Sequence, residues 1–134
     1  MNHVLAFYKF FQVGSPDELC SLVQDRARSL DILGTVLIAS EGLNGTVVGA
    51  KAQLESFSKF LEGIAGEISF KWSDIKDETD GFLRLKVVVK PEIVSFGVQN
   101  LDLAQTGQKV SALEWDALLK DPDLLLIDTR NKYE

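Results

Sequence analysis

The chain has 134 residues, 46% of them apolar, and a formal net charge of −6. This length suits one core of ordinary size and excludes two full domains, so we expect one domain with an appendage. The net charge argues against a protein that coats nucleic acid by bulk electrostatics, but it leaves room for a local basic face. One cysteine excludes an internal disulfide, and neither a membrane-spanning run nor a signal-peptide pattern is present. We therefore expect a reducing, cytoplasmic setting without contact with a membrane.

The first 34 residues predict a strand followed by a helix. Residues 4–11 alternate and are rich in aromatic side chains, which predicts a strand with both faces largely covered. Ser15, Pro16 and Glu18 then have the spacing of a reciprocal capping box with proline at the first helical position. The apolar stripe of this helix consists of Leu19, Leu22, Val23, Ala27 and Leu30. Gly34 follows the helix, where a left-handed C-cap residue is expected.

Residues 36–49 predict a β-hairpin, because two β-branched runs flank a segment that contains Gly42, Asn44 and Gly45. These residue types tolerate the backbone angles of a turn. A second helix over 52–61 follows. Its apolar positions recur at helical spacing: Leu54, Phe57, Phe60, Leu61 and Ile64.

Two further strands are predicted. Residues 67–73 alternate with one buried face, residues 74–81 form an acidic loop, and residues 82–90 form the clearest amphipathic strand. The resulting order is that of an α+β, ferredoxin-like βαββαβ fold, in which two helices cover one face of an antiparallel sheet. We expect this domain to span residues 1–96, with the strand around Phe70 as an extra strand that extends the sheet or pairs with the last strand.

Residues 97–123 are predicted to be a connector that contains a short helix over 111–119. A second capping box, formed by Ser111 and Glu114, marks the start of this helix. Residues 124–127 are continuously apolar, as in a strand buried on both faces of a parallel sheet. Such a strand needs neighbours that the small domain does not supply. We therefore interpret residues 124–134 as the truncated start of a second domain, and expect the segment from about Asp121 onward to be disordered or packed non-natively.

The candidate binding residues are basic. Arg84, Lys86 and Lys90 share one face of a strand, and Lys9 and Lys71 could join them if their strands are adjacent. With Phe82 and Phe7 interleaved, they would form a platform that tracks an RNA backbone and stacks bases. The alternative is an ordinary solvated face whose lysines discourage edge pairing. Two further candidate contacts, Glu41 and Asn44, are expected at the exposed tip of the hairpin.

Other chemistry is poorly supported by the residues. Cys20 lies at the margin of an apolar stripe with no feature that would lower its pKa, and His3 is expected to be solvated, so neither a metal site nor a Cys–His pair is expected. Residues 11–16 lack the arginine and the glycine-rich backbone that a phosphate-cradling loop requires. Hydrolysis of acyl phosphates is therefore not expected.

Several segments carry a resemblance. Asp128, Arg130 and Glu134 follow an apolar strand at the spacing of the opening signature of rhodanese domains. Upstream, residues 40–45 and 82–94 look like the N-terminal domain of the bacterial rhodanese-containing tRNA uridine hydroxylases. The same family is matched by residues 7–11 and 114–134, so the resemblance spans nearly the whole chain.

The resemblance implies an acylphosphatase-like domain followed by a rhodanese domain, in an enzyme that uses molecular oxygen to hydroxylate the wobble uridine of tRNA. In that family Asp128, Arg130 and Glu134 would stabilise the loop after the strand. The family's catalytic cysteine lies in a rhodanese loop beyond Glu134, so Cys20 is not its equivalent. We expect this chain to be monomeric, catalytically inactive by itself and without a cofactor or metal. Its role would be to position tRNA or, alternatively, to dock the rhodanese domain without touching RNA.

Overall fold

A computed structural model describes residues 2–75, 82–94, 97, 102, 105, 107–130 and 132. The chain divides into two units, Met1–Gln99 and Asn100–Glu134, and each is treated by itself below. The predicted acidic loop and connector lie partly outside the described residues.

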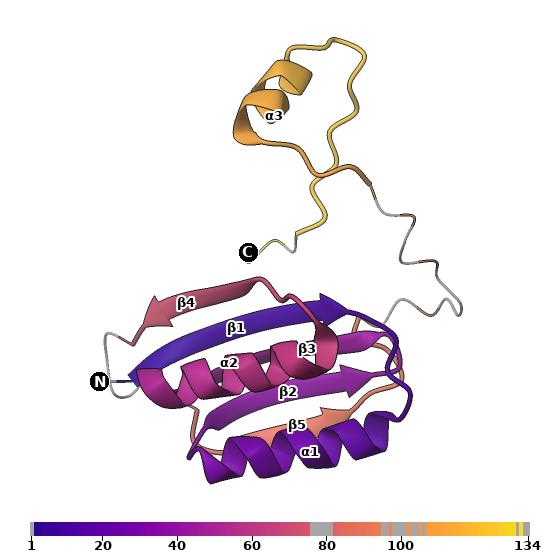
Figure 1. Ribbon diagram of the computed structural model, residues 1–134. Helices are drawn as coiled ribbons and strands as arrows, with labels where there is room; N and C mark the ends of the chain where they lie inside the picture. The colour runs from indigo at the N-terminus through magenta and orange to yellow at the C-terminus, as the bar shows by residue number, and fades with distance from the viewer. Residues whose placement is uncertain are drawn as a thin grey trace. The chain divides into compact units, whose positions relative to one another are not determined.

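The first unit is a five-stranded sheet with two helices (Figure 1). Its elements are β1 (Asn2–Phe10), α1 (Pro16–Ser29), β2 (Leu33–Ala39), β3 (Gly42–Ala50), α2 (Lys51–Ala65), β4 (Phe70–Asp74) and β5 (Leu85–Val89). The strands lie in the order β4-β1-β3-β2-β5. This arrangement confirms the predicted α+β, ferredoxin-like fold.

The sheet differs from the prediction in two respects. β5 pairs with β2 in parallel, so the sheet is mixed and not purely antiparallel. β4, the strand around Phe70, lies beside β1 and completes the βαββαβ motif. The extra strand is therefore β5, at the opposite edge, and the two strands do not pair with each other. Sequence periodicity predicts strands but carries no information on which strand lies next to which.

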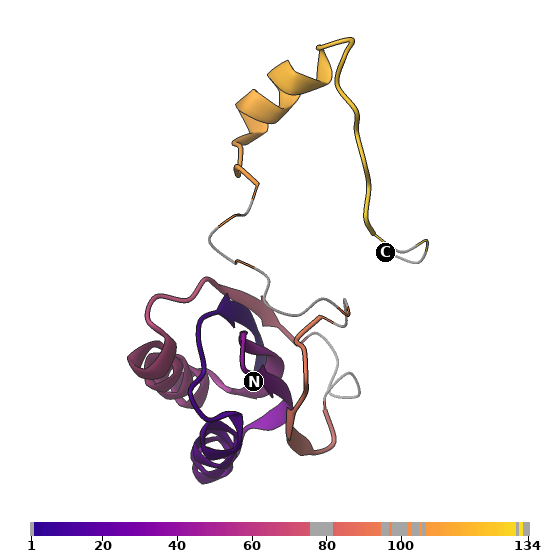
Figure 2. The same ribbon diagram turned by 90° about the vertical axis from the view of Figure 1, so that its right-hand side faces the viewer.

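Both helices cover the same face of the sheet, as Figure 2 shows. α1 packs on β2 and β5, and α2 packs on β1 and β3. The largest fully buried side chains are Leu5, Val23, Ile32, Val36, Ile38, Leu43, Val47, Leu54, Phe57 and Leu61. Each such side chain contributes about 1.5–3 kcal/mol by leaving water. Most residues of the two predicted apolar helix faces are buried or half-buried, but Leu22 of α1 is 57% exposed and Ile64 of α2 is also exposed.

The hairpin forms, but its turn is tighter than predicted. β2 and β3 are joined by Ser40 and Glu41 alone, so Gly42 and Gly45 lie within β3 and not in the turn. Gly42 has φ +146°, and a Cβ there would lie 2.1 Å from the Lys9 carbonyl oxygen. A Cβ on Gly45 would lie 2.6 Å from the Phe7 ring. These glycines are needed for close approach of β3 to β1, which makes room for an aromatic core residue.

The ends of α1 show which capping residues act. Ser15 accepts a hydrogen bond from the Glu18 N–H at 3.4 Å, but the described structure contains no return bond to the Ser15 N–H, so only half of the predicted box forms. At the other end, the Asp31 N–H donates to the Arg28 carbonyl and the Ile32 N–H to the Ala27 carbonyl. This is a Schellman motif with Asp31 at the left-handed position, φ 52°. Asp31, and not Gly34, ends the helix.

Replacing Asp31 by glycine should stabilise the protein by about 0.5–1 kcal/mol, because the left-handed conformation is unfavourable for residues with a Cβ. Asp31 is exposed, so no packing is lost. Urea denaturation followed by tryptophan fluorescence measures the change. Asp31→Ala is the matched control and should be no more stable than the original chain; equal midpoints for the two variants would contradict the assignment.

In the second unit, α3 (Ala112–Leu119) begins with a complete capping box. The Ser111 N–H donates to Glu114 Oε2 at 2.7 Å, and the Glu114 N–H donates to Ser111 Oγ at 3.3 Å. Hydrogen bonding to the Ser111 backbone, and secondarily to its hydroxyl, lowers the pKa of Glu114 below its ordinary value. The carboxylate is therefore the form that the helix start prefers.

Acidification should weaken this helix start. Because the pKa of Glu114 is lower in the folded segment than in the unfolded one, its contribution is present above the unfolded pKa and is lost as the pH falls through the folded pKa. The Ser111 amide resonance, followed by NMR between neutral and acidic pH, should report the loss. Glu114→Gln keeps an acceptor and removes the titration, so the Ser111 shift should then be independent of pH in this range.

Residues 124–127 do not form a strand. Leu125 is 80% and Ile127 69% exposed, and no secondary structure is assigned from Leu124 to Thr129. Residues 124–127, which were predicted to be buried on both faces of a sheet, are therefore exposed to solvent within their unit. The interpretation of residues 124–134 as the start of a second domain stays a prediction.

Candidate nucleic-acid interface

The face of the sheet opposite α1 and α2 is the candidate interface. Strand register and alternation place the following residues on this uncovered face: Val4, Ala6, Tyr8, Thr35, Leu37, Asn44, Thr46, Lys71, Lys86 and Val88. Most of the central side chains are small or β-branched and half-buried. They form a low surface, with longer side chains toward its edges.

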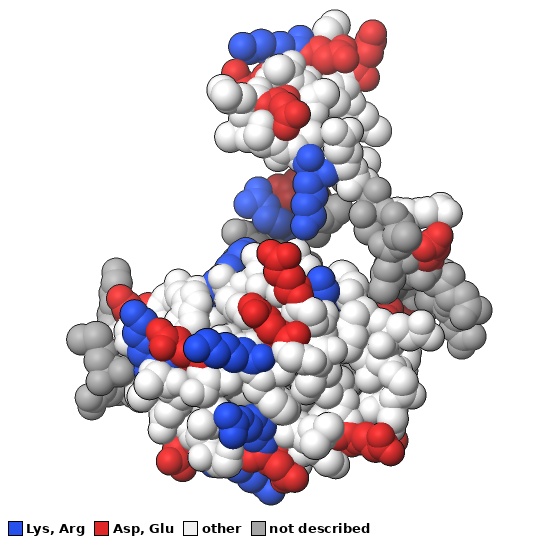
Figure 3. Space-filling view, viewed as in Figure 1, with Lys and Arg blue, Asp and Glu red and all other residues white. Residues whose placement is uncertain are grey.

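Charge is distributed unequally over the two faces. No strand position on the uncovered face holds Asp or Glu, whereas Lys71 and Lys86 both point from it. Figure 3 shows that acidic and basic side chains are mixed on the helix-covered side of the same unit. The chain as a whole is acidic, yet the strands present two lysines and no carboxylate on the uncovered face.

The predicted cations do not form one cluster. Arg84, Lys86 and Lys90 gather around β5, and both ends of that strand are tied to β2: the Gly34 N–H donates to the Arg84 carbonyl and the Lys90 N–H to the Ile38 carbonyl. Lys71 lies on β4 at the opposite edge. The two edges are four strand spacings apart, roughly 19 Å. The adjacency on which the combined platform depended is therefore wrong.

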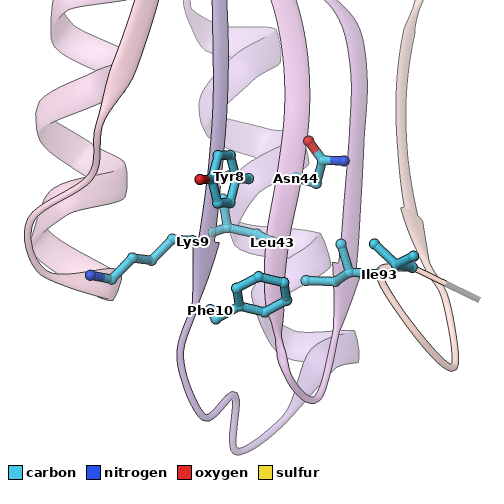
Figure 4. A pocket seen from close by; sticks show the side chains of 7 residues that line it. Tyr8, Lys9, Phe10, Leu43, Asn44 and Ile93 are labelled. Carbon is cyan, nitrogen blue, oxygen red and sulfur yellow. The ribbon is translucent and has the colours of Figure 1, made fainter. Parts of the chain in front are cut away.

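Lys9 is also placed differently from the prediction. It alternates with Tyr8 and Phe10 and so belongs to the register of the helix-covered face, at the end of β1. In Figure 4 its side chain extends away from Ile93. None of the five predicted cations forms an ion pair with a described residue. Each is free to contact a phosphate.

The exposed aromatic residues differ in part from the two that were predicted to stack on bases, Phe7 and Phe82. Phe7 is 3% exposed and packs edge-to-face against Phe57 and Phe70, with ring centroids 6.2 and 6.0 Å away. Phe82 is exposed, as the platform requires. Sequence reasoning missed Tyr8 and Phe10 because it treated both faces of β1 as covered. The alternation of Leu5 and Phe7 against these two residues was the signal that could have identified them.

Glu41 and Asn44 do not lie together at an exposed tip. Glu41 is in the turn, but its Oε1 accepts the Ile93 N–H at 2.7 Å and so holds the segment after β5. Asn44 is two residues into β3, half-buried, and in register with Tyr8 on β1 and Leu37 on β2. Glu41 therefore has a structural contact, and Asn44 belongs to the uncovered face.

A pocket of about 250 Å³ opens at this end of the uncovered face (Figure 4). It is lined by Tyr8, Lys9, Phe10, Leu43, Asn44, Ile93 and Val94. The Tyr8 and Phe10 rings meet edge-to-face at 6.2 Å. The lining is mostly apolar, with one amide group, as in sites that bind a planar organic group.

The remaining reactive residues are engaged in the fold. The Cys20 thiol donates to the Val87 carbonyl at 3.5 Å, and burial, with a smaller effect of Asp17, raises its pKa. This agrees with a partly buried structural cysteine and not with a nucleophile. His3 is not solvated as predicted, since its Nδ1 lies 2.7 Å from Asp74 Oδ1 on the neighbouring strand β4.

The loop between β1 and α1 offers few donors for a phosphate. The Phe11 N–H donates to the Glu41 carbonyl and the Val13 N–H to the Ser40 carbonyl. Pro16 has no N–H, and no arginine lies in the loop. Among the described residues, no group of three or more His, Cys, Asp or Glu side chains gathers to hold a metal ion, and no helix is long and apolar enough to cross a bilayer.

The rhodanese-like signature forms a local pair in the second unit. Arg130 Nε donates to Asp128 Oδ1 at 3.0 Å and Arg130 Nη2 donates to Oδ2 at 2.6 Å, which is a bidentate contact. These hydrogen bonds lower the pKa of Asp128 and raise that of Arg130. Asp128 and Arg130 are therefore each other's partners within this unit. Glu134 lies outside the described residues.

Relatives of named function match the whole chain. It is 37% identical over 134 residues to a tRNA uridine(34) hydroxylase of Jannaschia sp. (strain CCS1), a match that covers 100% of this chain and 44% of that protein. It is 33% identical over 135 residues to a protein of the same name from Wolbachia pipientis wMel, covering 100% of this chain and 49% of the relative. The chain thus spans about half the length of the curated relatives that it matches.

The fold has a solved counterpart. The crystal structure of acylphosphatase from Bacillus subtilis is similar with a TM-score of 0.51 and 19% identity, over 66% of this chain and 99% of that one. At this identity the likeness concerns the fold alone. The family model described as UPF0176 acylphosphatase like domain matches residues 2–93. Since this match covers more than half of the sequence, the chain belongs to the family of the UPF0176 acylphosphatase-like domain.

Proposed function

We propose that this chain is the tRNA-positioning part of a tRNA wobble-uridine hydroxylase and that its uncovered sheet face contacts the RNA backbone. The observation that carries the proposal is the distribution of charge on that face: Lys71 and Lys86 point from it, and no strand position on it is acidic. We choose tRNA as the ligand because the relatives are named tRNA uridine(34) hydroxylase.

The arrangement suits a polyanion despite the net charge of −6. Most described acidic side chains of the first unit lie on helices, in turns or at an edge, away from the uncovered face. Arg84, Lys86 and Lys90 carry no ion pair with a described residue, so phosphate contacts would not first have to break internal pairs. Contacts of this type position a nucleic acid without reading its sequence.

The chemistry itself is assigned to residues beyond this chain. Hydroxylation would consume molecular oxygen in the full protein, at a cysteine-bearing rhodanese domain that follows Glu134. Cys20 does not fit this role, because its thiol is partly buried against Val87 and its pKa is raised. We place the protein in the cytoplasm, where its tRNA substrate would be modified.

A second candidate function concerns the unit Asn100–Glu134, whose exposed apolar residues we propose are covered by the remainder of the rhodanese domain that residues 124–134 would begin. Leu124 to Ile127 and the α3 residues Trp115, Leu118 and Leu119 are exposed in that unit. Exposed apolar residues of this number are typical of a surface that another segment covers. This role does not exclude RNA contact by the first unit, and the two roles use different residues.

NMR titration of the 134-residue chain with tRNA tests the first proposal. At low salt, amide resonances of residues 84–90 should shift, and those of exposed α2 residues on the other face should stay in place. Added salt should reverse the shifts, because counterion release drives contacts with phosphate. Unmoved resonances across residues 84–90 would contradict RNA contact by this face.

A further inference from the structure

We infer that the pocket at the end of the uncovered face binds one unpaired nucleobase of an RNA strand. This inference rests on the proposed function and adds a base-binding site to a surface that would otherwise contact only phosphates. Its residues are Tyr8 and Phe10 from β1, Asn44 from β3, and Ile93 and Val94 from the segment after β5 (Figure 4).

The aromatic residues supply a stacking surface. Tyr8 is 52% and Phe10 42% exposed, which is unusual for two neighbouring rings on one strand face. The two rings meet edge-to-face at 6.2 Å and 69°, and both line the pocket. Single-stranded RNA binds to such surfaces by stacking of splayed bases on aromatic rings.

Asn44 supplies the polar complement. Strand register places it directly beside Tyr8, and its amide is half-buried but hydrogen-bonds to no described residue. An amide offers both donors and an acceptor, so it can pair with the donor and acceptor edge of a base. An aliphatic ligand would leave this half-buried group unsatisfied, which is unfavourable.

The far wall is held in place by Glu41. Its carboxylate accepts the Ile93 N–H at 2.7 Å and so holds the segment that contributes Ile93 and Val94 to the pocket. The volume, about 250 Å³, is below the roughly 300–1,000 Å³ of sites for drug-sized ligands and suits one ring system. The acid-free face beyond the pocket favours the nucleobase of a polyanion over an apolar protein side chain.

Two oligomers of equal charge separate base binding from phosphate binding: a tetrauridylate, and an abasic ribose-phosphate tetramer of the same length. Affinities for the 134-residue chain are measured by NMR at low salt. The original chain should prefer the tetrauridylate by about fivefold or more, the lower range for stacking of one base. Tyr8→Leu and Asn44→Leu should remove this preference and leave the abasic affinity unchanged.

Leu33→Ala is the matched control, because Leu33 is an exposed apolar residue of the same face, four positions along the strands from Asn44 and so about 13 Å from the pocket. It should keep the full preference. Equal affinity for the two oligomers would overturn the nucleobase site while leaving phosphate binding by the face intact, as would a preference that survives Tyr8→Leu. Binding of neither oligomer would overturn this inference and the proposed function together.

Discussion

Gly42→Ala should lower the free energy of unfolding by about 2–6 kcal/mol, through backbone strain and steric overlap together. Its φ of +146° is a region that residues with a Cβ rarely adopt, and the new Cβ would lie 2.1 Å from the Lys9 carbonyl oxygen and 3.0 Å from the Phe10 Cα. Backbone strain of this type costs about 1–3 kcal/mol, and overpacking adds about 1–3 kcal/mol. The clashing atoms are backbone, so a side-chain rotation cannot relieve the contact.

Gly49→Ala, in the same strand, is the control. Its φ is not in the left-handed region, and the atom nearest to the added methyl group would be in the Ile32 side chain, at 3.4 Å. This variant should remain within about 1 kcal/mol of the original chain. Urea denaturation by circular dichroism gives both values, and similar midpoints for the two variants would show that β3 can shift away from β1.

Reversal of two charges on β5 and the residue before it should have the largest effect on binding. In the full protein, Arg84→Glu with Lys86→Glu should lower tRNA affinity by about tenfold to a hundredfold at low salt and reduce the slope of log affinity against log salt by about 2, one for each lost phosphate contact. Both side chains reach solvent, so the fold should be preserved.

A matched variant changes the same net charge on the other face. Lys51→Glu with Lys59→Glu alters two exposed lysines of α2, which covers the opposite side of the sheet. At about 0.15 M salt it should leave tRNA affinity within about twofold, because the Debye length is then about 8 Å and exposed charges beyond it are largely screened. If both double variants weaken binding equally, net charge and not the uncovered face is responsible. Weakened docking of the rhodanese domain with normal tRNA binding would show that this sheet face, and not the unit Asn100–Glu134, makes the contact between the domains.

Membership in an acylphosphatase-like family does not by itself assign acylphosphatase chemistry to this chain. The loop from Phe11 to Ser15 uses two of its amides for bonds to Ser40 and Glu41, and it contains no arginine. The uncovered face of the same scaffold presents Lys71 and Lys86 and no carboxylate. This is the general relation between fold and function, in which the site and not the architecture decides the activity.

The sequence by itself determined the number, type and approximate bounds of the elements in the first unit. Apolar periodicity located the buried centres of both helices at Val23 and Phe57, and residue chemistry located the N-caps at Ser15 and Ser111. These features depend on neighbours within one or two turns, so a local pattern is sufficient to predict them.

Only the tertiary structure decided which surfaces those elements share. Strand order separated Lys71 from Lys86. The position of the helices buried Phe7 in the core and left Tyr8 and Phe10 exposed on the other face. The tertiary structure also places Gly42 within β3, against the Lys9 backbone, and not in the expected turn. Glu41 accepts a hydrogen bond from Ile93, 52 residues away. These outcomes depend on pairing between distant segments, and alternation within a strand does not state which neighbour it meets or which face a helix covers.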